Sequence, residues 1–461
     1  MTTPLPQTHA TICALATAPL PAGVAIIRVS GPAAWQAAAS VCPQFYSTLG
    51  TAQANTAIYA PISFKDEMID RAVLLPFRAP RSFTGEDVVE IQCHGGMAVV
   101  QAILNALLQF PTVRMAEAGE FTRRAFMNNK LDLTQAEGLA DLIAAETEEQ
   151  RRQAVRQMGG ELGNTFENWR AEILLLLAQV EAGIDFPDEE LDILADTVVL
   201  QKLERLLSTF ATALASSAGE RLREGFKLVI VGKPNAGKST LTNVLTGRET
   251  AIVSPLAGTT RDVVEARLNI GGFPVTLADT AGLRADTTDA IEQEGIRRAS
   301  QHAKQADVTI AVVDAAEWPT IAPEVAVHIR PHASVVVVSK ADKATPTITS
   351  AEVPVLALNL TDAASLPPLL AALETLIRAN FAQAQGAAQL TRQRHRTAIT
   401  AAQACLHNAQ NLLRNPPAGR SISELLAQDL RDAASHIGLI TGRTTNEDVL
   451  DVVFSTFCVG K

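Results

Sequence analysis

The sequence predicts a multidomain protein of mixed α+β and α/β class, in which a doubly wound, mostly parallel domain is inserted into a helical domain. Residues 222–380 alternate strand-like and helix-like segments, which is typical of a doubly wound sheet. The flanking residues 123–221 and 381–461 carry the i, i+3, i+4 apolar spacing of helices, and neither half forms a complete pattern alone. Residues 1–122 are richer in proline, glycine and β-branched residues, which favours a separate N-terminal α+β domain.

Apolar runs predict the individual strands. In the N-terminal domain they lie at 24–29 and 88–92. Gly271–Gly272 stands between two runs of the inserted domain and predicts a hairpin, so one edge of that sheet should be antiparallel. The helical pattern that follows breaks at 415–419, where two prolines and a glycine stand. The strands predicted for the inserted domain are 228–231, 265–270, 275–279, 308–314, 335–339 and 355–358.

The strongest motif is Gly232-Lys-Pro-Asn-Ala-Gly-Lys-Ser239, between a predicted strand and a helix expected to start at 240–245. This is the setting in which G-x-x-x-x-G-K-[ST] binds phosphates, because backbone N–H groups close around the anion and the helix dipole adds to them. Lys238 should reach the outer phosphates and Ser239 should bind Mg²⁺. An ordinary glycine-rich turn is the alternative. The expected nucleotide contacts here are Asn235, Ala236, Gly237, Lys238, Ser239 and Thr240.

Four further segments follow in the order that a GTPase requires. Thr260 is expected to give Mg²⁺ a second hydroxyl, and Asp279 to hold the ion through water. Asp342 can accept hydrogen bonds from N1 and N2 of guanine, which adenine cannot match. Residues 355–360 end the last strand, where a loop should close over the base. The expected GTP contacts are Ser254, Pro255, Leu256, Ala257, Gly258, Thr259, Thr260, Asp279, Thr280, Ala281, Gly282, Ser339, Lys340, Ala341 and Asp342.

The route to hydrolysis differs from that of Ras-type proteins, because Leu283 stands where a water-orienting glutamine is expected. A monovalent cation can replace the arginine that Ras-like proteins borrow, and the side-chain oxygen of Asn235 can bind it; loop capping is the alternative for Asn235. Glu292 is a candidate catalytic carboxylate, or else a solvated helix residue. The predicted potassium ligands are Asn235, Ser254, Leu256 and Thr259.

The bulk composition limits the class of protein. A net charge of −10 and a pI of about 5.4 argue against a protein whose whole surface binds nucleic acid. No apolar run reaches the roughly 18 residues that span a bilayer, and the N-terminus has no secretory pattern. The cysteines are scattered and odd in number, so neither a disulfide framework nor a zinc site is expected, and a cytoplasmic setting fits.

The chain resembles the MnmE (TrmE) family of tRNA-modifying GTPases over essentially its whole length. A P-loop alone indicates only an NTPase. Four segments outside the nucleotide motifs make the resemblance specific, and they flank an inserted GTPase domain. These segments are Gly23–Gly31, Ser82–Gly96, Ala118–Phe126 continuing into Asn129–Leu133, and Cys458-Val-Gly-Lys461.

The resemblance implies that the N-terminal domain is similar to tetrahydrofolate-binding domains, mediates a homodimer and holds 5-formyltetrahydrofolate or a related one-carbon folate. Arg28, Glu90, Lys130 and Lys461 would contact this folate. Basic side chains suit its glutamate carboxylates, and Glu90 suits the N–H donors of the pterin. On local sequence alone, Arg28 and Glu90 can also be ordinary surface residues.

The resemblance further implies a K⁺-activated GTPase whose GTPase domains pair across the dimer, with Glu292 orienting water. An FAD- and NADH-using protein of the MnmG (GidA) type would join it in a heterotetramer or larger complex. Together they would place an aminomethyl or carboxymethylaminomethyl group on C5 of the wobble uridine, position 34, of tRNA. Cys458 is a candidate nucleophile, with a packed or folate-adjacent role as the alternative. The competing function is a non-enzymatic GTP-dependent switch, for example a ribosome assembly factor.

Two positions depart from the family pattern. The base-reading motif begins with Ser339 where the family usually has asparagine, and the closing loop has Asn359–Leu360 where Ser-Ala is usual. Serine is too short to repeat all the contacts of an amide. Both changes concern guanine recognition rather than phosphate or Mg²⁺. We therefore expect GTP specificity to persist through Asp342, with weaker affinity.

Overall fold

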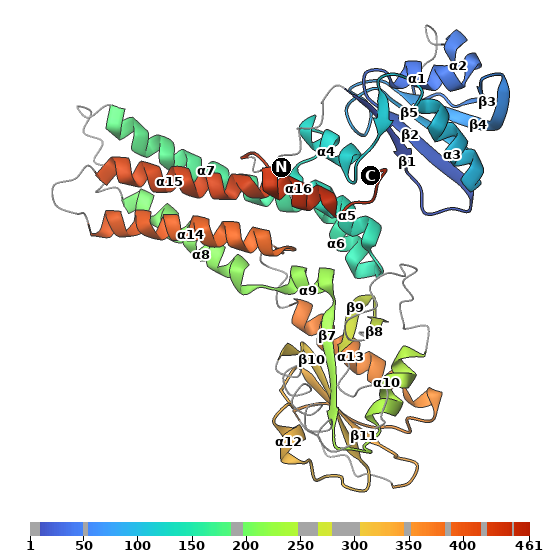
Figure 1. Cartoon of the computed structure of the whole chain (residues 1–461). Helices are drawn as coiled ribbons and strands as arrows, with labels where there is room; N and C mark the ends of the chain where they lie inside the picture. The colour runs from blue at the N-terminus through green and yellow to red at the C-terminus, as the bar shows by residue number, and fades with distance from the viewer. Residues whose placement is uncertain are drawn as a thin grey trace, which may run out of the picture. The chain divides into compact units, whose positions relative to one another are not determined.

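The computed structural model (Figure 1) describes residues 10–48, 54–185, 197–247, 266–278, 305–344, 352–382, 389–415, 422–444 and 447–461. The chain divides into two compact units. The first consists of Met1–Ala140 and Thr441–Lys461, and the second of Asp141–Ile440. Among the described residues, no helix has both the length and the apolar character needed to cross a membrane.

The first unit is built on a six-stranded sheet with the order β3-β4-β5-β2-β1-β6. Its strands pair antiparallel except for β1 and β6, which are parallel. Alternating residues of the strands pack with α1, α2 and α3 in one core around Trp35 and Phe45. The elements are β1 (Thr11–Leu15), β2 (Ala22–Ser30), α1 (Ala34–Val41), α2 (Pro43–Thr48), β3 (Ile58–Phe64), β4 (Glu67–Phe77), β5 (Val88–Gly95), α3 (Met97–Leu107) and β6 (Val113–Met115).

The C-terminal end of the chain folds into this first unit. Helices α4 (Glu120–Met127) and α16 (Glu447–Ser455) pack together, with Phe126 and Phe454 in ring contact at 6.1 Å between centroids. Val459 forms a β-bridge with Ala118. Gly460 has φ +99°, and a Cβ there would collide with the carbonyl oxygen of Leu15. Only glycine therefore fits where the C-terminal tail passes strand β1.

A buried ion network ties α4 to the sheet. Glu120, only 5% exposed, accepts hydrogen bonds from Arg114 at 2.6 and 2.8 Å and from Arg124 at 2.9 Å. Arg124 also contacts Glu86 at 3.1 Å, and Glu86 accepts a hydrogen bond from Ser30 at 2.7 Å. Burial alone would raise the pKa of Glu120, but its hydrogen bonds outweigh burial and hold the pKa below its usual range.

The helical part of the second unit has one core that draws on residues from both sides of the nucleotide domain. Phe166, Trp169 and Phe210 come from before that domain, and Ile399 and Leu430 from after it. Its long helices are amphipathic, so they bury their apolar faces against one another. They are α7 (Glu161–Asp185), α8 (Thr197–Ala215), α14 (Gln393–Arg414) and α15 (Ile422–Thr441). Shorter helices are α5 (Leu133–Ala144), which begins in the first unit, α6 (Glu148–Met158) and α9 (Ala218–Glu224).

The nucleotide domain contains a second six-stranded sheet with the order β12-β11-β10-β7-β9-β8. All neighbours are parallel except β8 and β9, whose antiparallel hairpin turns at Gly271–Gly272; this confirms the predicted antiparallel edge. The elements are β7 (Phe226–Gly232), α10 (Lys238–Thr246), β8 (Ala266–Ile270), β9 (Phe273–Ala278), β10 (Val308–Asp314), α12 (Pro323–Ala326), β11 (Ser334–Ser339), β12 (Val355–Ala357), η1 (Ala363–Ser365) and α13 (Pro367–Ala382).

Candidate functional site

The carboxyl edge of the second sheet brings several predicted motifs together. Strand β7 ends at Gly232 and runs into the P-loop, and β11 ends at Ser339 and runs into Lys340–Asp342. Strand β12 is followed by Asn359–Leu360. Parallel strands place their carboxyl ends at one edge of a sheet, which is where open α/β sheets bind ligands.

The P-loop backbone has the curvature that a phosphate cradle needs. Asn235 has φ +62° and Gly237 has φ +99°, both in the left-handed region. Gly237 is the N-cap of α10, so the helix begins at Lys238, two residues before the predicted start at Thr240. The N–H groups of the loop and of the first helical turn therefore converge at a positive helix end.

The side chains of the P-loop are placed for a nucleotide phosphate and Mg²⁺. The Nζ of Lys238 donates to the carbonyl oxygens of Gly232 at 2.8 Å and Lys233 at 2.7 Å, so the ammonium lies across the loop. Ser239 and Thr240 are exposed at the start of α10. A hydroxyl beside the lysine predicted to bind phosphate suits a hard cation that keeps several waters, so the position of Ser239 fits the Mg²⁺ role predicted for it.

The base-reading end contains one ion pair that sequence reasoning missed. The Nζ of Lys340 contacts Asp314 at 2.5 Å, because Asp314 lies directly beside Ser339 in the parallel pairing of β10 with β11. The hydrogen bond from Lys340 holds the pKa of Asp314 below its usual value. Asp342 is exposed beyond them, and Ser339 is fully buried. Asp314 stands at the end of a predicted strand, and this position is the sequence signal that could have identified it as a site residue.

Several predicted nucleotide residues lie outside the described part of the chain, and their roles stay predictions. This applies to the switch segment, to the Asp-Thr-Ala-Gly motif and to the candidate catalytic carboxylate. They are Ser254, Pro255, Leu256, Ala257, Gly258, Thr259, Thr260, Asp279, Thr280, Ala281, Gly282 and Glu292.

In the first unit, the predicted folate residues Arg28 and Glu90 form one ion pair. They face each other across β2 and β5, and the Nη2 of Arg28 lies 2.8 Å from Glu90. The guanidinium also lies 5.5 Å from the ring centre of Phe83 and 5.6 Å from that of Phe121. Phe83 and Phe121 were missed as site residues, although both stand in the segments that carry the family resemblance.

Lys130 contacts the same loop as Phe83. Its Nζ donates to the carbonyl oxygen of Pro80 at 3.0 Å, and its side chain packs on Gly85, which has φ +77°. Arg28 and Lys130 therefore both contact the loop 80–85. Phe121 is fully buried, so it can only support Arg28 from below, whereas the Arg28–Glu90 pair, the exposed ring of Phe83 and Lys130 can together hold a flat heterocycle that carries carboxylates.

The C-terminal tail lies in the same unit. Cys458 is exposed, and its carbonyl oxygen accepts hydrogen bonds from the backbone N–H of Gly119 at 3.4 Å and of Lys461 at 3.2 Å. Gly460 passes Leu15, whose neighbour Ala14 is paired with Arg28. The thiol is therefore not packed in the core, and its role as nucleophile stays a prediction.

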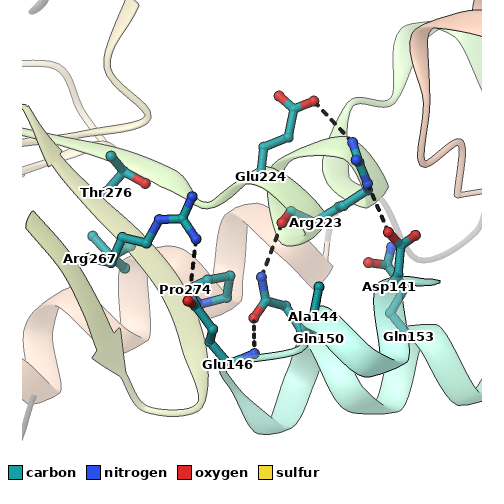
Figure 2. Close-up of a pocket in the computed structure, with 11 residues that line it drawn as sticks. Asp141, Ala144, Glu146, Gln150, Gln153, Arg223, Glu224, Arg267, Pro274 and Thr276 are labelled. Atoms are coloured by element: carbon teal, nitrogen blue, oxygen red, sulfur yellow. Dashed lines mark hydrogen bonds and ion pairs between the residues drawn. The ribbon is translucent and has the colours of Figure 1, made fainter. Parts of the chain in front are cut away.

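A cavity of about 350 Å³ lies where α6 meets the β8–β9 hairpin (Figure 2). Its charges are held in pairs: Arg223 contacts Asp141 at 3.1 Å, and Arg267 contacts Glu146 at 3.1 Å. Gln150 donates to the carbonyl oxygen of Arg223 at 3.1 Å. These contacts indicate a polar packing interface rather than a ligand site. The Arg267–Glu146 pair connects the segment just before α6 to the hairpin, which separates the two predicted switch motifs in sequence.

Comparison with known proteins gives strong matches over the whole chain. The family described as "GTP-binding protein TrmE N-terminus" matches residues 11–130, and the "MnmE helical domain" matches residues 133–458. A "tRNA modification GTPase MnmE" of Rhodospirillum rubrum is 46% identical over 98% of this chain and 99% of its own length. The protein of that name from Parvibaculum lavamentivorans is 47% identical over 98% and 100%. A mitochondrial 5-taurinomethyluridine tRNA synthase subunit of Danio rerio is 41% identical over 98% and 93%.

Proposed function

Because this chain belongs to the MnmE family of tRNA modification GTPases, we propose that it hydrolyses GTP to drive modification of C5 of the wobble uridine, position 34, of tRNA. The observation that carries the proposal is the P-loop at the carboxyl edge of the second sheet, with Lys238 across it and Asp342 exposed just after β11 at the same edge. The name of the zebrafish relative supports C5 of uridine as the target, since that protein makes a 5-substituted uridine.

Each nucleotide-site residue has a proposed task. Lys238 binds the outer phosphates and neutralises charge that develops on them, while Asp342 accepts hydrogen bonds from the guanine edge. Ser239 and Thr260 hold Mg²⁺, which neutralises charge on the transferring phosphate. Glu292 orients the attacking water, because Leu283 has no polar group to do so. Asn235 holds K⁺ with Ser254, Leu256 and Thr259, and K⁺ supplies the positive charge that an arginine supplies elsewhere.

The first unit is proposed to resemble folate-binding domains and to hold a one-carbon tetrahydrofolate. The pairing of Arg28 with Glu90, the two rings beside it and the nearby Lys130 support this assignment, and Lys461 would complete the site. A pterin can stack on the exposed ring of Phe83 while Glu90 accepts its N–H groups. The exposed Cys458 is kept as a candidate nucleophile.

The proposal includes partners. The chain would form a homodimer and join an FAD-dependent protein of the MnmG type in a heterotetramer or larger complex acting on tRNA in the cytoplasm. The word "subunit" in the name of the zebrafish relative supports such an assembly. The net charge of −10 supports it as well, because a partner would then supply part of the positive surface that tRNA requires.

In cells that lack this chain, the C5 modification of the wobble uridine should be absent, and the wild-type chain should restore it. Arg28→Ala should fail to restore it, since Glu90 loses its partner and the folate its cation. The purified variant should still hydrolyse GTP, because Arg28 belongs to the other compact unit. Mass spectrometry of tRNA nucleosides and GTP turnover measure the two properties.

Lys65→Ala is the matched control, because Lys65 also places a cation over a phenyl ring, 5.2 Å from that of Phe64, but at an exposed hairpin. It should restore modification fully. Intact C5 modification in cells without the chain would reject the main function and favour an assembly factor. Full restoration by Arg28→Ala would reject the folate site alone.

GTP turnover should be roughly tenfold or more faster in K⁺ than in Na⁺, because a fitting cation replaces an arginine worth about 10³–10⁵ in rate. Asn235→Gly should abolish this preference and keep GDP affinity. Glycine tolerates the φ of +62° found at this position, and the substitution removes the side-chain amide that carries the proposed ligand oxygen. Turnover is measured at equal ionic strength in the two salts.

Equal wild-type rates in the two salts would remove the cation mechanism. A variant that is still stimulated by K⁺ would show that Asn235 is not a ligand of the ion.

A further inference from the structure

Ser339, the first departure from the family pattern, contacts the P-loop. Its Oγ donates to the carbonyl oxygen of Ala236 at 2.7 Å and lies 3.3 Å from that of Val313. Ser339 and Ala236 are 103 positions apart in sequence, and Ser339 is fully buried. This hydrogen bond therefore fastens the end of β11 to the residue that precedes the last glycine of the P-loop.

Leu360, the second departure, reaches the same place. The position that a Cβ would take on Gly237 lies 3.1 Å from the Cδ1 of Leu360 and 3.6 Å from the Cβ of Ser339. Leu360 is 5% exposed and belongs to the core of the nucleotide domain. Ser339 and Leu360, two of the three residues at which the sequence departs from the expected family pattern, thus converge on Gly237, where the backbone turns into α10.

We propose that Ser339 positions the P-loop and does not contact the base, so that this chain reads guanine through Asp342 without a side-chain donor to N7. Leu360 supports the same P-loop glycine by packing. The inference rests on the proposed GTP site and states which edge of the purine that site recognises.

The chemistry of a hydroxyl carries the argument. A serine has one O–H proton, and that of Ser339 is already donated to Ala236 inside the protein. An asparagine in this position has two N–H donors, so it can hold the P-loop and still donate to N7, which is an acceptor on the purine edge. Asp342 accepts from N1 and N2, and those contacts do not involve N7.

The test compares GDP with 7-deaza-GDP, which lacks the N7 acceptor, by calorimetric titration of the full chain with Mg²⁺ present. The wild-type chain should bind the two nucleotides with Kd values within about twofold. Ser339→Ala should weaken both equally, by about 2- to 10-fold, which corresponds to one neutral hydrogen bond. A residue that only supports the fold would change stability and leave both affinities unaltered.

Two further variants complete the test. Ser334→Ala is the matched control: Ser334 is also a fully buried serine on β11, but it accepts a hydrogen bond from the backbone N–H of Arg330 at the other end of the strand. It should lose a similar amount of stability and keep both affinities. The double variant Ser339→Asn with Leu360→Ala restores the usual residues at these two positions and should prefer GDP over 7-deaza-GDP by about 2- to 10-fold.

The inference is overturned if the wild-type chain prefers GDP over 7-deaza-GDP by more than about fivefold and Ser339→Ala abolishes that preference, since Ser339 would then contact N7. It is also overturned if Ser339→Ala changes neither affinity, or if the double variant shows no preference. Failure of the wild-type chain to bind GDP at all would reject the GTP site itself, which is a different result.

Discussion

Lys238→Ala should lower kcat/KM for GTP hydrolysis by roughly 10²–10³, the cost of removing one preorganised charge-stabilising donor from a phosphate or oxyanion site. The carbonyl oxygens of Gly232 and Lys233 hold the Nζ of Lys238 across the loop. Its positive charge is therefore already in the loop that would bind the phosphates. A bound nucleotide would replace two neutral acceptors by anionic ones, which form stronger hydrogen bonds with an ammonium group. Steady-state GTP turnover in K⁺ and Mg²⁺ measures the loss.

Lys233→Ala provides the matched control, because Lys233 belongs to the same loop but pairs with Glu317 at 2.9 Å, and both side chains are nearly half exposed. Exposed pairs contribute little, since solvent screens them. Lys233→Ala should therefore keep turnover close to the wild-type rate. If Lys238→Ala hydrolyses GTP as fast as the wild-type chain, the phosphate-binding role of Lys238 is wrong and the GTPase site must be placed elsewhere.

The P-loop could be predicted from sequence because its signals are local. A buried strand, a glycine-rich turn and a helix start stand in one continuous segment, and each has its own residue pattern. The predicted helix start at Thr240 was two residues late. Gly237 adopts a left-handed conformation and acts as the N-cap, so Lys238 is already helical. Glycine allows such an early start, but its presence alone does not reveal its φ.

The pairing of Arg28 with Glu90 could not be predicted in the same way. Both residues were selected by resemblance, yet 62 positions separate them, and they meet only because of the register between β2 and β5. A shift of one residue in that register would turn one of them to the other face of the sheet. The contact between Ser339 and Ala236 could not be predicted either. It joins the end of β11 to the loop that follows β7, and these segments meet only in the folded sheet.

The ion network around Glu120 contains both kinds of contact, those that the local sequence predicts and those that depend on the fold. The i,i+4 spacing of Glu120 and Arg124 on α4 can be found in the sequence. Arg114 and Glu86 join the network through the fold alone, from β6 and from the loop before β5. The local pattern therefore predicts the Glu120–Arg124 pair. The burial that determines how much this pair contributes to stability depends on tertiary packing.

Glu120→Ala should destabilise the first unit by about 3–5 kcal/mol, the cost of breaking a buried ion pair by removing one partner. The guanidinium of Arg114 would lose the carboxylate that it hydrogen-bonds, and that of Arg124, which belongs to a residue only 9% exposed, would keep only its contact with Glu86. Hydrogen exchange of peptides from β2 and β5 measures the change in the full chain. Because the folded-state pKa of Glu120 is lowered, its carboxylate stabilises the fold above the unfolded pKa of about 4.3, and that contribution disappears as the pH falls through the lower folded value.

Glu148→Ala separates burial from pairing, because Glu148 also accepts hydrogen bonds from two arginines, Arg151 and Arg152, but on an exposed helix face. These partners lower the pKa of Glu148 to about 2, yet solvent screens the pair, so its removal should change the hydrogen exchange of peptides from its own helix, α6, little. The wild-type chain and Glu120→Ala should approach each other in stability as the pH falls below the unfolded pKa of about 4.3 and through the lower folded pKa of Glu120, where the wild-type carboxylate becomes protonated. Equal exchange in the wild-type chain and both variants at neutral pH would show that burial adds nothing to the Glu120 network.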